Sequence, residues 1–161
     1  MSKATVPGLT LDMHANFRNN LVTMIPKMDS KVTITDLPDH QGHRCLIQHI
    51  KMPIMMSNRS IVQCYYLIEN EDGSIVFIAS SRGLEDVVAA NSGIIKKDVV
   101  ANNIINYTKL TPTENGCEWV SVQALDIAGS IPDALKRQGA ERQAKVAMNM
   151  IQLIKTGEAP S

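Results

Sequence analysis

The sequence predicts an α+β fold in which one curved antiparallel sheet wraps a long C-terminal helix. Two observations lead to this prediction. Short β-prone segments alternate with turn signals through the middle of the chain, which is typical of hairpin-linked strands. Residues 118–135 then read as a strand that stops at a glycine and turns directly into a helix. The chain has 161 residues, a length that suits a single domain.

The first third of the chain carries one helical and three strand-like patterns. Residues 3–6 should form a short strand that ends at Pro7 and Gly8. Residues 10–28 should be helical, because apolar side chains recur on one side, with Pro26 interrupting the helix near its end. Strands are expected over residues 31–37 and 43–51, joined by a turn at 39–42, and an apolar loop should follow over residues 52–58.

The middle of the chain predicts further antiparallel pairing. Strands are expected over residues 59–68 and 74–80, with a turn at 69–73 between them. Residues 81–91 fit a loop or a short helix. Residues 94–110 should form a strand with a kink or bulge near Asn102 and Asn103. A turn at residues 111–116 then leads into the last strand.

The C-terminal segment is the only long helical pattern. Ser130, Pro132 and Asp133 suit a helix N-terminus. Apolar residues then recur at steps of three and four and share one face, namely Ala140, Ala144, Ala147, Ile151 and Ile154. This stripe indicates either a helix that covers a core or one that closes a cavity, and spacing alone leaves both open. Residues 156–161 should form a flexible tail.

Composition and charge exclude several functions. Lys plus Arg and Asp plus Glu number 16 each, so the net charge is zero and no basic nucleic-acid-binding footprint is expected. No secretory leader and no membrane-spanning segment is evident. The three cysteines, Cys45, Cys64 and Cys117, are few and odd in number, which favours free thiols in a reducing compartment. We therefore expect a cytoplasmic protein.

The loop over residues 52–58 is unusually apolar, with Met52, Ile54, Met55 and Met56. Loops normally face water, and exposed apolar clusters usually mark interaction sites. Either the loop folds back into its own core, or it acts as a flap over an apolar cavity that can touch a lipid surface.

Three motifs together resemble signatures of the steroidogenic acute regulatory protein-related lipid transfer (START) domain family. They are Met28-Asp29, which resembles a Trp-Asp pair, Pro53-x-x-x-Ser57-x-Arg59-x-x-Val62 followed by the Asp72-Gly73 hairpin, and Asp126-x-x-Gly129-x-Ile131-Pro132-x-x-Leu135. Their order and separation agree with the family, and the resemblance covers residues 6–154.

The resemblance implies a helix-grip fold, in which a single lipid lies in an apolar tunnel between the sheet and the C-terminal helix. It implies a non-enzymatic lipid-binding or lipid-transfer protein with no cofactor, transient membrane contact, and a gate loop at Met52, Ile54, Met55 and Met56. The implied ligand-binding residues are Tyr65, Ile78, Gln143, Ala147 and Ile151. The implied structural residues are Arg59, Asp126, Gly129 and Pro132.

Two departures from the family bear on these implications. An Arg-Asp pair of the family appears here as Arg59-Ser60, so an acidic partner for Arg59 must come from elsewhere. Family domains also have a helix and two further strands before the point that matches Lys3. Without them one sheet edge is open. We therefore expect either a homodimer that forms through this edge or a pocket that is shrunken or filled.

Two other classes of function stay open. One is a protein-interaction module that keeps the fold but has lost its lipid. The other is a metal- or cofactor-dependent enzyme on the same scaffold, for which His40, His43, Cys45 and His49 form the densest cluster. A straight strand spreads His43 and His49 far apart, and paired short spacings typical of structural zinc sites are missing, so no metal site is predicted.

Overall fold

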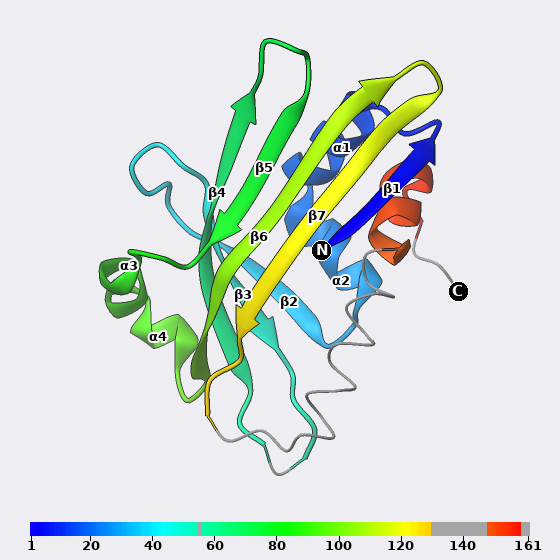
Figure 1. The fold of residues 1–161 in the computed structure, drawn as a ribbon. Coiled ribbons are helices and arrows are strands. Elements are labelled where there is room, and N and C mark those ends of the chain that lie inside the picture. The colour runs from blue at the N-terminus through cyan, green and yellow to red at the C-terminus, as the bar shows by residue number, and fades with distance from the viewer. Residues whose placement is uncertain (55, 130–147, 159–161) are drawn as a thin grey trace.

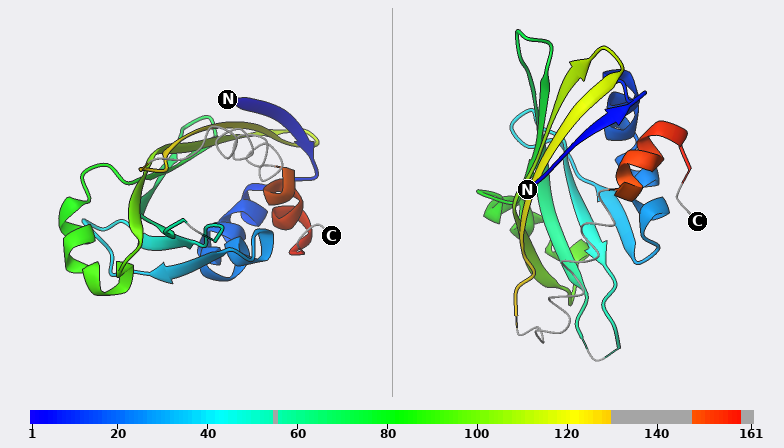
Figure 2. Two further views of the ribbon diagram at one scale, coloured as in Figure 1. Left: turned by 90° about the horizontal axis from the view of Figure 1, so that it is seen from below. Right: turned by 45° about the vertical axis from the view of Figure 1, so that its right-hand side comes forward.

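The computed structural model describes residues 1–54, 56–129 and 148–158. Within them a seven-stranded sheet has the strand order β1-β7-β6-β5-β4-β3-β2, and all these neighbours are antiparallel (Figure 1). Helices lie on both faces of the curved sheet (Figure 2). The predicted α+β class with a curved antiparallel sheet is confirmed.

The first strand, β1 (Ser2–Pro7), lies at one edge of the sheet and pairs with the last strand, β7 (Gly116–Asp126). Their close approach requires Gly116, because a Cβ at this position would collide with the Val6 carbonyl and the backbone of Gly8. Residues 2–5 are exposed and only Val6 is buried. The expected short N-terminal strand is therefore present, and it forms an open edge of the described sheet.

Two helices follow, α1 (Leu11–Asn19) and α2 (Leu21–Met28), where the sequence predicted one. The break lies at Asn20 and not at Pro26, which sits inside α2. Asn20 leaves the helical region with φ −114° and ψ 27°, and its side-chain amide donates to the Asn16 carbonyl at 2.8 Å. Local side-chain bonding of this kind competes with helix continuation, so the predicted position of the interruption is wrong.

The central strands follow the predicted hairpins. They are β2 (Val32–Asp36), β3 (Cys45–Ile50), β4 (Arg59–Glu69) and β5 (Ile75–Ser80). Helices α3 (Glu85–Ala90) and α4 (Ser92–Ile95) come next and confirm the short-helix interpretation of residues 81–91. The next strand, β6 (Val99–Thr113), begins five residues later than predicted because Ile94 and Ile95 belong to α4.

Strand β6 contains the predicted irregularity. Its register against β7 shifts between Asn103 and Ile105. Asn106 pairs with Ala79, which also pairs with Tyr65, so these three side chains share one face of the sheet. Asn103 reaches the same face, because its amide donates to Gln63, two residues from Tyr65 on β4. The bulge thus turns both asparagines toward one side.

Apolar cores lie on the two faces of the sheet. On the concave face, α1, α2 and the helical residues 148–156 pack on the strands (Figure 2). The members of this core include Phe17, Leu21, Trp119, Leu153 and Ile154. On the convex face, α3 and α4 cover a smaller cluster that includes Ile47, Val62 and Leu84.

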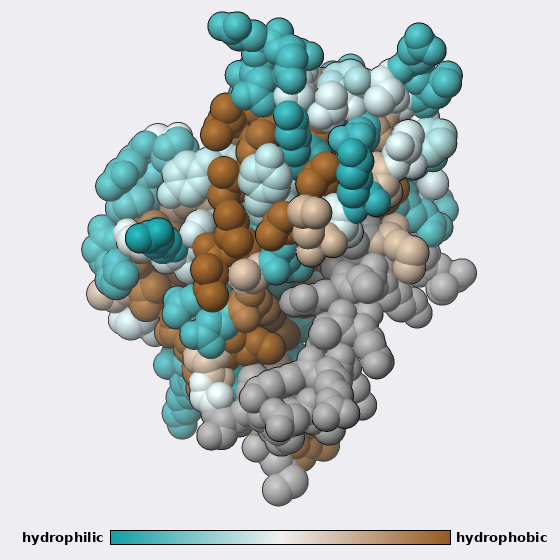
Figure 3. Space-filling model, viewed as in Figure 1, coloured by the Kyte–Doolittle hydropathy of each residue, from teal (hydrophilic) through white to brown (hydrophobic). Residues whose placement is uncertain are grey.

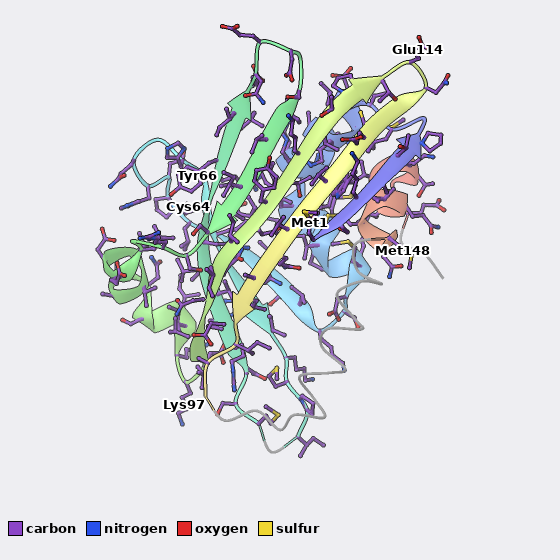
Figure 4. All side chains as sticks on the ribbon, viewed as in Figure 1. Met1, Cys64, Tyr66, Lys97, Glu114 and Met148 are labelled. Atoms are coloured by element: carbon purple, nitrogen blue, oxygen red, sulfur yellow. A yellow bond between two sulfur atoms is a disulfide. The ribbon has the colours of Figure 1, made fainter. Side chains whose placement is uncertain are left out.

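The cysteine prediction needs a correction. Cys45 and Cys64 oppose each other across β3 and β4 with Cα atoms 4.1 Å apart and form a disulfide. Both are fully buried in the convex cluster, and Cys64 lies beside Tyr66 on β4 (Figure 4). Strand pairing brought together residues that are 19 apart in sequence. Only Cys117 keeps a free thiol, so the argument for a reducing compartment loses its basis.

The convex face of β5, β6 and β7 carries apolar side chains at its surface (Figure 3). Ile78 is partly exposed, and Ile104 is 59% exposed at the bulge. None of the described helices is long and apolar enough to cross a bilayer.

Candidate ligand-binding site

A cluster of neutral polar side chains lies on the concave face of the sheet. The amide nitrogen of Asn103 donates to Gln63 Oε1 at 2.6 Å and to the Ala79 carbonyl at 3.2 Å. Gln63 Nε2 donates to the Tyr65 hydroxyl oxygen at 2.7 Å and approaches Gln48 Oε1 at 3.4 Å. Strand alternation produces the cluster, because Gln63 and Tyr65 are two apart on β4 and Gln48 lies on neighbouring β3.

Two atoms at the centre of the cluster keep unused hydrogen-bonding capacity, namely Asn103 Oδ1 and the Tyr65 hydroxyl. Asn103 is 3% exposed, yet its Oδ1 has no hydrogen-bond partner among the described residues. The Tyr65 hydroxyl accepts from Gln63, and within the described part of the chain its own proton has no acceptor. Buried polar atoms are almost always paired, so an unpaired one calls for an explanation such as a bound ligand.

The chemistry of this cluster suits an uncharged ligand group. Its side chains are amides and a phenol, and burial raises the pKa of Tyr65 above its ordinary value, which keeps the hydroxyl neutral. A hydroxyl or amide on a ligand could donate to Asn103 Oδ1 and accept from Tyr65. A bare anion would find no cationic partner in the cluster.

Aromatic rings extend the concave face beyond Tyr65. The Tyr65 and Phe77 rings stack with centroids 5.1 Å apart, and His14 from α1 meets Phe77 edge-on at 5.7 Å. His14 also meets the Trp119 ring at 5.8 Å. Burial, with a smaller contribution from the Arg18 charge, lowers the pKa of His14 to about 4, so the imidazole is neutral at pH 7. These aromatic rings are uncharged, and the Arg18 guanidinium lies 5.8 Å from the centroid of the Phe77 ring.

Arg59 anchors the junction that follows β7. This side chain is 4% exposed, and its guanidinium donates to the carbonyls of Ile127 at 2.8 Å and Ala128 at 3.2 Å, and also to that of Ser57. The acidic partner expected from elsewhere is therefore replaced by backbone carbonyls, which satisfy the guanidinium without a second charge.

The neighbouring Asp126 and Gly129 shape the same junction. Asp126 Oδ1 accepts from the Ala128 N–H at 3.0 Å, a local turn bond. Gly129 has φ +75°, a conformation that disfavours a side chain, and a Cβ there would lie 3.5 Å from Arg59. The two residues thus direct the chain past the Arg59 guanidinium.

The Met-rich loop lies between β3 and β4. Ile54 is 96% exposed, while Met52 and Met56 are partly exposed. The Met52 N–H donates to Asn58 Oδ1 at 3.1 Å, which ties the two ends of the loop together. Ile54 therefore does not fill the protein's own core, and the tip of the loop presents an apolar side chain to its surroundings.

The expected ligand-binding residues are placed as follows. Tyr65 is on the concave face, and Ile151 is partly buried against the concave core. Ile78 pairs with Tyr66 and therefore lies on the convex face, so its expected inward orientation is corrected. Phe77, one residue earlier, takes the place beside Tyr65 because side chains alternate along a strand. Gln143, Ala147, Met55 and Pro132 lie outside the described residues.

Sequence reasoning missed Gln48, Gln63 and Asn103. The signal that could have found Gln63 is a polar residue in phase with Ile61 and Tyr65 within a strand that is otherwise buried. Asn103 was noted only for the bulge, and its orientation depends on that bulge. Among the described residues no group of three His, Cys, Asp or Glu side chains is arranged to hold a metal ion.

Comparisons with known proteins place this geometry in a fold class. No protein-family model matches the sequence, and no curated protein matches it. Solved structures do match. Human STARD10 aligns with a TM-score of 0.68 and 14% identity over 95% of this chain. Human StAR-related lipid transfer protein 5 aligns with a TM-score of 0.69 and 15% identity, over 96% of this chain and 74% of its own.

A bacterial STAR-related lipid transfer protein from Xanthomonas axonopodis aligns with a TM-score of 0.58 and 18% identity over 86% of this chain and 74% of its own. The chain spans 61% of the STARD10 structure. At these identities the likeness shows the fold alone, and it confirms a START-like, helix-grip fold.

Proposed function

We propose that this protein binds one lipid or other hydrophobic molecule between the concave face of the sheet and the C-terminal helix, and transfers it between membranes. The observation that carries this proposal is the unpaired Asn103 Oδ1, which is buried in a neutral polar cluster on an apolar face. Ligand pockets combine an apolar lining with a few well-placed polar groups. The proteins with similar folds are named as lipid transfer proteins, which supports the same function.

The proposed ligand contacts are Tyr65, Gln63, Asn103 and Phe77 on the strands, with Ile151, Gln143 and Ala147 expected from the C-terminal segment. The alternative of an interaction module without a ligand gains no specific support, since it gives Asn103 Oδ1 no partner. Nothing in the proposed function requires a cofactor or bond-forming chemistry, so we propose a carrier and not an enzyme.

The gate loop supplies the proposed membrane contact. Ile54 at its tip is exposed, and Met52 and Met56 can adapt to disordered acyl chains. Inserting such a loop at the bilayer surface would open a route by which the lipid avoids water. Exposing an acyl chain to water costs about 0.8 kcal/mol per CH₂. We propose that this contact is transient.

The open edge of β1 is the proposed dimer contact. Its exposed residues 2–5 leave one side of the strand unpaired within the described sheet, and such edges pair readily with another strand. Light scattering on wild-type protein and on Thr5→Pro tests this, because the Thr5 N–H is in phase with Pro7 and points away from β7, so proline removes a donor from the open edge. A monomer at all concentrations would rule the contact out.

Uptake of fluorescent sterol, ceramide and phosphatidylcholine from vesicles tests the lipid proposal, together with native mass spectrometry of the purified protein. We expect at least one probe to be taken up in a 1:1 ratio. Asn103→Leu should weaken uptake of a hydroxyl-bearing probe about tenfold, because it removes the free acceptor. Asn102→Leu is the matched control, since that neighbour is exposed. No uptake of any probe and no co-purified lipid would contradict the proposal.

A further inference from the structure

A second group of polar side chains lies on the opposite, convex face of the sheet, beside the gate loop. Thr33 on β2 opposes His49 on β3, and His49 opposes Ser60 on β4. Beyond β2 and β3 the ladder continues through a bond from the Lys51 N–H to the Lys31 carbonyl at 2.8 Å. Alternation puts Lys31 and Lys51 on the same face as Thr33 and His49.

These side chains surround a pocket of about 220 Å³. Its lining includes Lys31, Thr33, His49, Lys51, Asn58 and Asp98. A water molecule occupies about 30 Å³ of liquid, so the pocket has room for a polyatomic group. The pocket is separate from the concave cluster, because the thickness of the sheet lies between them.

The charges in the pocket are unbalanced. Lysines directly opposite each other across two strands repel, and neither Lys31 nor Lys51 forms an ion pair with a carboxylate of the described residues. Asp29 contacts the Lys31 backbone N–H at 3.0 Å. The one carboxylate in the lining, Asp98, is already engaged by Ser60 at 2.6 Å and His49 at 3.2 Å.

The hydrogen bonds assign the proton of His49. A carboxylate only accepts, so the Ser60 hydroxyl donates its single proton to Asp98. The Ser60 oxygen, 2.8 Å from His49 Nδ1, must then accept, which places a proton on Nδ1. Nε2 has no partner in the described part of the chain. Ser60 and Asp98 therefore fix the ring and leave Nε2 available to a ligand.

We propose that this pocket binds a phosphate group, between the ammonium groups of Lys31 and Lys51 and next to His49 Nε2. A phosphate monoester carries close to two negative charges near pH 7, which matches the two unpaired lysines. Asn58 Oδ1 accepts from Met52, so the amide nitrogen of Asn58 remains as a further donor. The monoanionic form of the ester keeps one hydroxyl, which can donate to Nε2 of the His49 ring.

The pocket's position leaves two sources for this phosphate. Lys51 immediately precedes the gate loop and Asn58 ends it, so the phosphate of a lipid headgroup could enter when the loop touches a membrane. A soluble phosphate monoester could enter directly from solution. The chemistry recognised is the same in both cases, and the experiment separates them.

The experiment has a soluble arm and a vesicle arm. Calorimetry measures binding of inorganic phosphate and glycerol 3-phosphate, and sedimentation measures binding to phosphatidylcholine vesicles with and without phosphatidic acid. Lys31→Gln/Lys51→Gln should weaken binding in the responding arm roughly a hundredfold, because two charge-assisted hydrogen bonds are lost. Arg82→Gln/Lys109→Gln removes the same charge outside the pocket and should change binding less than threefold.

A measurement on the unmodified protein covers the case of a variant that misfolds. The imidazole resonances of His49 should shift on saturation with the responding ligand, while those of buried His14 should not. Binding in the soluble arm identifies a small phosphate ligand, and binding only to phosphatidic acid vesicles identifies a headgroup. Absence of binding in both arms, an equal loss in both double variants, or unmoved His49 resonances would overturn the proposal. Each of these results is independent of lipid uptake on the concave side.

Discussion

The Arg59 side chain and the Ile127 backbone are joined by a hydrogen bond of 2.8 Å, from Nε to the carbonyl oxygen. The bond connects the first residue of β4 to the chain directly after β7, although 68 positions separate the two residues. It therefore fixes the direction in which the chain leaves the sheet, at the end where the gate loop also begins.

Arg59→Met should destabilise the fold. It leaves the carbonyls of Ile127, Ala128 and Ser57 without their donor, and the expected loss is about 3 kcal/mol in the free energy of unfolding. Urea denaturation measures it. Arg82→Met, at an exposed position, is the control and should change stability by less than about 0.5 kcal/mol. Equal effects of the two substitutions would refute the anchoring role of Arg59.

Tyr65→Phe should cost about 1–2 kcal/mol in the free energy of unfolding, because Gln63 Nε2 would keep only its 3.4 Å contact with Gln48. Tyr66→Phe is the matched control. It is the next residue, it faces the convex side, and its hydroxyl makes no hydrogen bond with the described residues. If removal of either hydroxyl has the same effect, the polar cluster contributes nothing specific.

Stability should depend on pH through His14. Its pKa is about 4 in the folded protein and 6.5 ordinarily. Between these pH values His14 is protonated in the unfolded chain and neutral in the folded protein. The contribution of this group is complete above about pH 7, declines as the pH falls from 6.5 toward 4, and then levels off. The difference between the two pKa values corresponds to a total loss of about 3 kcal/mol in the free energy of unfolding.

Urea denaturation at several pH values, on wild-type protein and on His14→Phe, isolates that contribution. The variant should lose less stability than wild type between pH 7 and pH 4, because phenylalanine fills the aromatic cluster without titrating. His40→Asn, which alters a partly exposed histidine, should follow the wild-type curve. Parallel curves for wild type and His14→Phe would show that His14 is not held neutral.

Thiol titration should find one reactive cysteine per unfolded chain without reductant and three after reduction. In the folded protein Cys117 should resist alkylation, since burial raises the pKa of its thiol. Cys45→Ala/Cys64→Ala should lower the free energy of unfolding by roughly 3 kcal/mol, as expected for a short closed loop. Three reactive thiols without reductant would show that the cross-strand disulfide does not form in solution.

Local patterns predicted most of the architecture because each depends on neighbouring residues. The alternation of β2 and β3, the turns between strands and the irregularity at Asn103 all follow from residues within one element. The break at Asn20 was missed because proline is the stronger general signal, while the Asn20 amide acts through one specific bond to Asn16. The carbonyl partners of Arg59 lie on a distant segment, and no local pattern encodes them.

The candidate site was predictable only in part. Both Tyr65 and Ile78 were implied by the family resemblance; Tyr65 lies on the concave face, whereas the implied orientation of Ile78 was wrong by one residue, because Phe77 lies beside Tyr65. A one-residue error exchanges the two faces of a strand. The disulfide was missed because cysteine counting cannot register that Cys45 and Cys64 become cross-strand neighbours.

The bulge in β6 has a consequence for how this chain tolerates change. Odd-numbered Asn103 before it and even-numbered Asn106 after it point the same way, so the parity of the strand switches once along its length. Deleting Ile104 would remove the bulge and restore unbroken alternation, and both asparagines would stay on the same face because they would then be two residues apart. In a loop, the loss of a single codon is usually absorbed. Loss of a regularly paired residue such as Thr108 would instead exchange lining for surface along the rest of β6, the longest described strand.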